Sequence, residues 1–463
     1  MSDLRGKLAR LFGSGPPAPR SIDPSAVDPS APEVSSVELV APEAPRPTSA
    51  DEARRARIAG LRALIAEKER ADRNALRDHK PLARSVPRER GLPGAVEETP
   101  LGPLHRVASY LPPAHTHGRV RIADALGARS SSLASLSLDA TLADVDPRRM
   151  LLLDTETTGL SGGTGTLPFL IGMAWFEDES LHVEQLFLRR PGEEAPMLAR
   201  LAERIAWASC IVTYNGKSFD WPLLRTRAVM NRIKVPTPSA HLDLLHAARR
   251  IFGPRVGSVR LVTMEETVLG MRRTRDVDGA EIPDLYWQFV RGHEGHVLVP
   301  VIEHNANDLV ALAALVAVLE ERWSSPSPRH EPEDRVALAR LALRGDEARF
   351  AYDVARGVAG EEPPPRIAYD ALTTGAEAAR KLKDPHAELE LLARAVALCG
   401  DHPKVQEAHL RMAICLEHRH RDPQRALFHA ERAGEDEKRR ARLAKKLEKK
   451  LTAASAPKKR RRA

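Results

Sequence analysis

Two acidic side chains near the middle of the chain have the spacing of a metal site. Asp154 and Glu156 directly follow the apolar run Leu151–Leu153 and stand two residues apart. A short apolar run predicts a buried strand, in which side chains two residues apart lie on the same face. Two buried carboxylates repel each other and are costly to desolvate. A cation between them would remove this conflict, and oxygen ligands suit Mg²⁺ or Mn²⁺. The alternative is a pair of exposed acids at a strand end, without a metal.

A histidine and an aspartate further along could complete such a site. His304 and Asp308 stand four residues apart in a segment rich in Ala, Leu and Val, which predicts a helix over 301–319. This spacing places them one turn apart on one helix face. If Asp308 held a metal, His304 could take a proton from the attacking water, a task that suits a histidine with its ordinary pKa of ~6.5. The alternative is a surface His–Asp pair.

Asp220 is the fourth acid of the set. It follows the apolar run 210–214, which predicts a strand, and it precedes Trp221-Pro222, where a helix with an N-cap acid is expected. N-cap aspartates are common without any functional role. Asp220 could nevertheless cap a helix and face the carboxyl ends of the strands, where ligands gather in α/β sheets.

A sheet must bring these distant segments together. Apolar runs predict a second strand at 169–176 and a third at 181–188, in an antiparallel meander that makes the Asp154 strand central. A helix is expected at about 195–207. Short alternating stretches within 95–145 predict further strands ahead of the main sheet. The fold class is therefore α/β, with a mixed sheet and flanking helices.

Three motifs together resemble those of DnaQ-like DEDD exonucleases. They are D-x-E-T-T-G at 154–159, Y-N-G-x-x-F-D-x-P-L-L at 214–224 and H-N-x-x-D at 304–308. The chain is most similar to the YprB-type ribonuclease H-like family, which shares the runs at Asp243–Arg250 and Ile282–Tyr286 and the lead-in runs at Glu98–Gly102 and His117–Arg119. The resemblance covers about residues 95–323.

The resemblance implies a ribonuclease H-like mixed sheet and a metal-dependent 3′→5′ exonuclease of single-stranded DNA or RNA. Two Mg²⁺ or Mn²⁺ ions would be held by Asp154, Glu156, Asp220 and Asp308, with His304 as general base. DnaQ-type enzymes place that histidine five residues before the last aspartate, whereas the interval here is four. The residues expected to bind the substrate are Thr157, Asn215, Phe219 and Asn305.

The flanking segments predict a linker and a helical array. Residues 1–94 are Pro- and Ser-rich and predict a largely disordered linker with one amphipathic helix at 51–80. Residues 330–453 read as tetratricopeptide-like helical repeats, because Lys383-Asp384-Pro385 recurs as Arg421-Asp422-Pro423, each at the start of a helix. These repeats could bind a protein partner. Residues 454–463 form a basic tail.

Composition limits the class of protein. The net charge of +8 arises near the C-terminus, because 438–463 holds 13 Lys and Arg against one acid, which leaves −4 for the rest. This segment could bind the phosphates of a nucleic acid, or it could be a solvated helix end with a disordered tail. No apolar run approaches ~20 residues, so no membrane span is expected. Three scattered cysteines and the lack of a signal sequence predict a cytoplasmic protein.

Two other functions remain open at this stage. The domain could be an inactive nuclease fold that serves as a binding module, with the helical repeats as the working surface. It could also cleave structured nucleic acid internally. Metal titration would separate the first alternative from an enzyme, and product lengths would identify the second.

Overall fold

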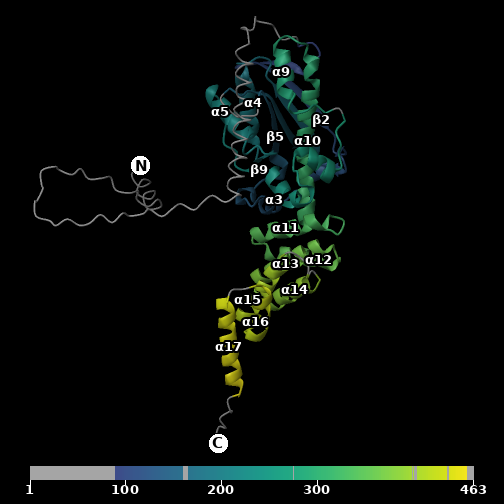
Figure 1. Cartoon of the computed structure of the whole chain (residues 1–463). Helices are drawn as coiled ribbons and strands as arrows, with labels where there is room; N and C mark the ends of the chain where they lie inside the picture. Colours follow the sequence, from purple (N-terminus) through teal and green to yellow (C-terminus); the bar gives the residue numbers. More distant parts are fainter. Residues whose placement is uncertain are drawn as a thin grey trace, which may run out of the picture. The chain divides into compact units, whose positions relative to one another are not determined.

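The computed structural model describes residues 89–159, 165–274, 276–398, 400, 404–434 and 437–455. It contains a seven-stranded mixed sheet, whose strands β2, β5 and β9 are labelled in Figure 1. Contacts divide the chain into Met1–Pro81 and Leu82–Ala463, and all described residues belong to the second unit. The predicted linker up to residue 88, its helix at 51–80 and the tail from residue 456 onward lie outside the described residues.

The strands follow the spatial order β1-β2-β7-β6-β5-β8-β9. Pairs from β1 to β5 are antiparallel, and β5-β8 and β8-β9 are parallel. The predicted meander is confirmed, because β5 lies between β6 and β8, and the segment before it supplies two further strands to the same sheet. The bounds are β1 (Ala95–Thr99), β2 (Gly102–Leu111), β5 (Met150–Thr157), β6 (Pro168–Glu177), β7 (Ser180–Phe187), β8 (Cys210–Thr213) and β9 (His241–Asp243).

Helices cover both faces of this sheet. One face carries the core that contains α4 (Glu194–Trp207) and α9 (Ile282–Val290). The other packs against α3 (Ser130–Ser137), α6 (Leu244–Ile251) and the long α10 (Val299–Ser324). Helix α5 (Asp220–Met230) follows β8. The predicted helix at 195–207 is thus observed one residue earlier, within the usual uncertainty of helix ends.

Strand β5 is buried on both faces, because alternate side chains point in opposite directions. Leu151 and Leu153 belong to the core beneath α4 and α9, while Leu152 belongs to the core beneath α10. A strand covered on both sides can be apolar at every position, which explains the unbroken run before Asp154. The acids therefore begin where the strand leaves the core.

Helix α10 is the apolar helix of the domain core. The segment Gly295–Ser324 is long and apolar enough to cross a membrane by length and composition, which the sequence analysis had not anticipated. In the folded chain, 72% of its most apolar window is buried. Its residues Ala311, Ala313 and Ala314 have no exposure and belong to the core on one face of the sheet.

A run of antiparallel helices follows, as predicted from the repeated K/R-D-P motif. Lys383 and Arg421 both adopt left-handed φ angles, of 61° and 53°, and so end one helix immediately before the next. Asp384 and Asp422 then each accept a hydrogen bond from a backbone N–H of the following helix, at 3.0 and 3.2 Å. The helices, green to yellow in Figure 1, are α11 (Pro332–Arg344), α12 (Ala348–Gly360), α13 (Pro365–Lys381), α14 (Pro385–Leu398), α15 (Val405–His418), α16 (Pro423–Arg432) and α17 (Glu437–Ser455).

Candidate active site

The first two acids lie at the carboxyl end of the central strand. Asp154 and Glu156 are both part-exposed and belong to β5. The Asp154 carboxylate oxygen Oδ2 accepts a hydrogen bond of 2.7 Å from the Asn305 side-chain amide. Since Asn305 belongs to α10, this bond ties the strand that carries two acids to the helix that carries Asp308.

Asn305 is fully buried and is held in place by the sheet. Its side-chain oxygen accepts a 2.9 Å hydrogen bond from Gln185 on β7, which also donates to the backbone carbonyl of Ile302 at 2.8 Å. Asp154, Gly172 and Gln185 are register partners on three adjacent strands, and the Asn305 side chain lies over them. A Cβ at Gly172 would lie 2.1 Å from the Asn305 oxygen, so only glycine leaves room here.

This arrangement does not fit the predicted contact between Asn305 and substrate. The amide donates to Asp154 and its oxygen accepts from Gln185, while the side chain is withdrawn from solvent. Asn305 therefore orients the Asp154 carboxylate from inside the protein.

Asp220 is the first residue of α5 rather than its N-cap. The cap position is Phe219, whose side chain makes no capping hydrogen bond, and Asp220 instead accepts a hydrogen bond of 2.5 Å from the Thr155 hydroxyl on β5. The loop before it is fixed by Asp243, whose carboxylate accepts from the backbone N–H of Asn215 at 2.8 Å and of Lys217 at 3.1 Å. Asp220 is thereby attached directly to the strand that carries Asp154 and Glu156.

His304 and Asp308 lie on one face of α10, one turn apart, as predicted. The His304 Nε2 atom lies 3.8 Å from the Asp308 Oδ2 atom. The second oxygen of Asp308 is hydrogen-bonded by the Arg273 guanidinium, and His304 Nδ1 donates to Asp276 at 2.7 Å. Neither Arg273 nor Asp276 was singled out from the sequence.

Burial raises the pKa of all four acidic groups, and repulsion from Asp308 adds to the rise in the other three. In Asp154 and Glu156 the pKa is well above its ordinary value, first because of burial and next because of the Asp308 charge. Burial raises the pKa of Asp220 to about 6. Burial also raises the pKa of Asp308, although Arg273 opposes that rise. Asp308 contributes to the raised pKa of each of the other three, so the four groups lie close enough to repel one another.

This set of donors suits hard divalent cations. Carboxylate oxygens are the ligands that Mg²⁺ and Mn²⁺ prefer, and a cation relieves repulsion among buried acids. Within the described residues, no three His, Cys, Asp or Glu side chains already converge as a metal site. Asp154, Asp220 and Asp308 are instead hydrogen-bonded to protein partners. The oxygen atoms of these acids are suitable ligands for such ions. To bind an ion, the carboxylates would have to reorient from their present hydrogen-bond partners.

The other predicted substrate residues lie near the acids in the chain. Thr157 ends β5, and its hydroxyl donates to the backbone carbonyl of Gly159 at 2.9 Å. Asn215 adopts a left-handed φ of 71° at the turn after β8. Phe219 is 57% exposed immediately before Asp220, although it is a large apolar side chain. An exposed aromatic ring beside the acids is available to stack on a base.

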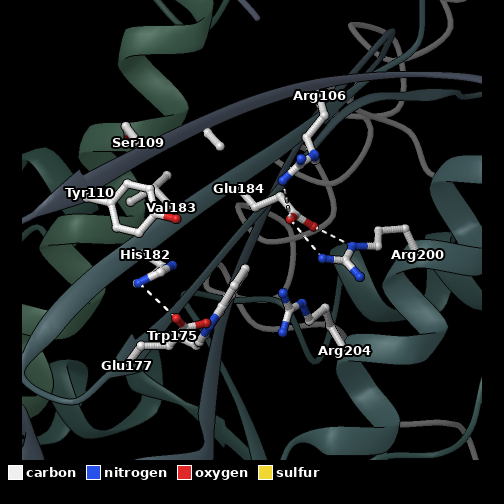
Figure 2. Close-up of a pocket in the computed structure, with 11 residues that line it drawn as sticks. Arg106, Ser109, Tyr110, Trp175, Glu177, His182, Val183, Glu184, Arg200 and Arg204 are labelled. Atoms are coloured by element: carbon white, nitrogen blue, oxygen red, sulfur yellow. Dashed lines mark hydrogen bonds and ion pairs between the residues drawn. The ribbon is translucent and has the colours of Figure 1, made fainter. Parts of the chain in front are cut away.

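A separate hollow of about 120 Å³ lies on the opposite face of the sheet (Figure 2). There, Arg200 donates to the buried Glu184 carboxylate at 2.8 and 3.0 Å, and Arg106 approaches it at 3.4 Å. The Arg204 guanidinium lies 3.7 Å above the Trp175 ring. Arg106 and Arg200 therefore neutralise Glu184, and Arg204 stacks on Trp175. Contacts within the protein account for these charged side chains.

Comparison with known proteins matches the same part of the chain. Residues 151–320 match the family described as the RNase_H superfamily, and this range contains all four acids and His304. A segment of 187 residues is 37% identical to the uncharacterised protein YprB of Bacillus subtilis strain 168. The matched segment is 40% of this chain and 45% of that relative, so the chain spans less than half the length of the curated protein it matches.

Proposed function

We propose that this protein is a metal-dependent 3′→5′ exonuclease of single-stranded DNA or RNA. The match of residues 151–320 to the RNase_H superfamily supports a nuclease fold for this part of the chain. The observation that carries the proposal is the group of four acids from three segments, Asp154, Glu156, Asp220 and Asp308. The charge of Asp308, which lies beside His304, raises the pKa of the other three. Such a concentration of buried negative charge is costly unless it binds cations.

In this proposal the four acids would hold two Mg²⁺ or Mn²⁺ ions. When bound, the ions supply a lowered pKa for the attacking water and charge stabilisation for the attacking and leaving oxygens of an in-line phosphoryl displacement. His304 takes the proton from the water at Nε2, because its Nδ1 is occupied by Asp276. Phe219 stacks on a terminal base, and Asn215 contacts the terminal nucleotide. The 3′→5′ polarity follows from the resemblance to DnaQ-like exonucleases.

Degradation of end-labelled oligonucleotides tests the activity. Single-stranded DNA and RNA of the same sequence are incubated with the full chain and Mg²⁺ or Mn²⁺. Asp154→Asn keeps the shape of the side chain and removes its charge, so we expect activity to fall by at least about 100-fold, the order of loss for an electrostatic group at the transition state.

The matched control is Asp178→Asn in the β6–β7 turn. Asp178 has a left-handed φ of 52°, which asparagine tolerates, and activity should remain unchanged. Shortening by single nucleotides from the 3′ end supports the exonuclease, whereas internal fragments support an endonuclease. Equal rates for the protein and Asp154→Asn would refute the assignment of this site.

A binding module is the second candidate function. Two observations favour it: Arg273 already neutralises Asp308, and the described residues contain no preformed metal-binding group. In that case the helices α11–α17 would be the working surface for a protein partner. Calorimetric titration with Mn²⁺ distinguishes the two, because a binding module that has lost catalysis would show no saturable uptake of the ion.

A further inference from the structure

Arg273 is a buried cation with a different carboxylate at each guanidinium nitrogen. Its side chain is 4% exposed. Nε pairs with Glu265 at 2.8 Å, Nη1 with Asp276 at 3.2 Å, and Nη2 with Asp308 at a shorter distance. Only Asp308 belongs to the four acids of the candidate site. Two of the three partners therefore anchor the guanidinium from outside the site.

The outer anchor is itself fixed by the lead-in motif of the domain. Glu265, in the π-helix Glu265–Leu269, has no exposure and receives a 2.7 Å hydrogen bond from the His117 ring. The next residue, Gly118, has a φ of 65°, and a Cβ there would lie 2.2 Å from the Leu269 carbonyl oxygen. This close approach holds the His117 segment against the end of the π-helix, so Glu265 has little freedom to move.

Asp276 links this anchor to the histidine. One of its carboxylate oxygens accepts from Arg273 Nη1, and the other accepts from His304 Nδ1 at 2.7 Å. Arg273 Nη1, which can only donate, also lies 3.4 Å from Nδ1, but the Asp276 carboxylate oxygen, which can only accept, is nearer at 2.7 Å. We infer from the shorter contact that Nδ1 carries the proton, and in a neutral ring Nε2 is then the unprotonated nitrogen. Nε2 is the atom that lies 3.8 Å from Asp308. Asp276 thus selects the tautomer whose lone pair faces the acids.

Arg273 has a corresponding effect on Asp308. It occupies Oδ1 and leaves Oδ2 on the side of His304. The planar guanidinium donates in fixed directions, so it restricts rotation of the carboxylate as well as neutralising it. A lysine ammonium in the same place would supply the charge without that directional restraint.

We propose that Arg273 and Asp276 are positioning residues, which set the orientation of Asp308 and the tautomer of His304 so that Oδ2 and Nε2 face the reacting atoms. The proposal rests on the nuclease function proposed above. It assigns the reaction chemistry to Asp308 and His304, and it assigns to Arg273 and Asp276 only the geometry of those two side chains.

Arg273→Lys tests the directional restraint, because lysine keeps the positive charge but lacks the planar guanidinium with its fixed donor directions. We expect kcat to fall at least ~30-fold and KM to change less than ~3-fold, since small misplacements of reacting groups can cost about 100-fold in rate. Binding of Mn²⁺, measured from the free-ion electron paramagnetic resonance signal, should keep its stoichiometry. The control is Arg255→Lys, at a half-buried bidentate pair with Asp334 (2.9 and 2.7 Å), which should keep both kcat and KM.

The tautomer of His304 gives a readout that does not need activity. In ¹⁵N-histidine-labelled, metal-free protein at about pH 8.5, the His304 signals are identified by their loss in His304→Gln, and they should report a proton on Nδ1. Asp276→Ala should shift the ring toward a mixture of tautomers while circular dichroism shows an unchanged fold.

The results separate this proposal from the function on which it rests. Full kcat in Arg273→Lys, or a proton on Nε2 of His304 in the unmodified chain, would overturn the positioning roles while leaving the nuclease assignment in place. An unmodified chain that binds Mn²⁺ but cleaves no oligonucleotide would refute the nuclease function. The tautomer measurement would still decide the role of Asp276.

Discussion

Replacing Gly172 by alanine should disturb the acids without touching any of them. The added Cβ would lie 2.1 Å from the Asn305 oxygen and 2.8 Å from its Cγ atom, so the buried side chain has to move. Overpacking of this kind costs about 1–3 kcal/mol. Losing the hydrogen bond to the charged Asp154 costs about 1.5–3 kcal/mol more. We expect Gly172→Ala to lower the free energy of unfolding by about 2.5–6 kcal/mol from these two contributions.

A double-mutant cycle isolates the steric contact. Asn305→Ala alone loses the hydrogen bonds and leaves a space. Adding Gly172→Ala to it should cost little more, because the new methyl group meets no amide. The magnitude of the coupling free energy should therefore equal the whole cost of the single mutation Gly172→Ala, about 2.5–6 kcal/mol.

Urea unfolding followed by tryptophan fluorescence measures these energies. Four of the five tryptophans, at positions 175, 207, 221 and 287, lie in the sheet domain, and Trp323 at the end of α10 stacks on Phe350 of α12, so the signal reports mainly the sheet domain. Gly127→Ala is the matched control, because its Cβ would meet nothing within 4 Å. Additive costs in the double mutant, or a cost below about 1 kcal/mol for Gly172→Ala, would refute the steric account.

Three further outcomes follow from the charges of the molecule. The pKa of Asp220 is raised to about 6 from an ordinary 3.8, so between these pH values the folded metal-free protein holds more protons than the unfolded chain. Its stability should therefore fall as pH rises from 3.8 to 6. Calorimetry in two buffers of different ionisation enthalpy should show proton release when Mn²⁺ binds at pH 6. Lys445 and Lys449 lie on one exposed face of α17. If both contact phosphates, reversing both charges should reduce the slope of log affinity against log salt concentration by at least ~1.4, which is ~0.7 per lost phosphate contact. Fluorescence anisotropy with a single-stranded oligonucleotide measures this slope. Burial and the neighbouring His409 lower the pKa of His429 to about 4, so the α15–α16 pair should lose stability as pH falls from 6.5 toward 4. Amide hydrogen exchange of these helices should show the loss, and His429→Gln should reduce it, leaving the smaller part that comes from the lowered pKa of His409.

Local patterns were enough to predict the sheet and the residues at its edge. The apolar run before Asp154 predicted a buried strand, because a strand covered on both faces can be apolar at every position, and the antiparallel meander after it predicted its central place. The spacing of His304 and Asp308 predicted one helix face, because the α-helix repeats every 3.6 residues. The repeated Lys-Asp-Pro and Arg-Asp-Pro motifs predicted helix starts, because proline and a capping acid are locally suited to them.

Sequence patterns missed the residues that orient the acids. Asn305 was expected to contact substrate, and only the structure showed it buried beneath Gln185 and bonded to Asp154, 151 residues away in the chain. Gly172 lies within an apolar strand, and no local pattern indicates why a glycine stands there. A glycine is needed there because the Asn305 side chain packs against it, and Asn305 belongs to α10, more than a hundred residues later in the chain.

The sequence by itself determined which residues are acidic, which segments become strands or helices, and hence which side chains reach the carboxyl end of β5. The tertiary structure decided how those side chains are held. Arg273 meets Asp308 across 35 residues and Glu265 meets His117 across 148, and no local periodicity links such positions. Their pairing arises because charges withdrawn from water must find partners, and only the packed chain determines which partners are within reach.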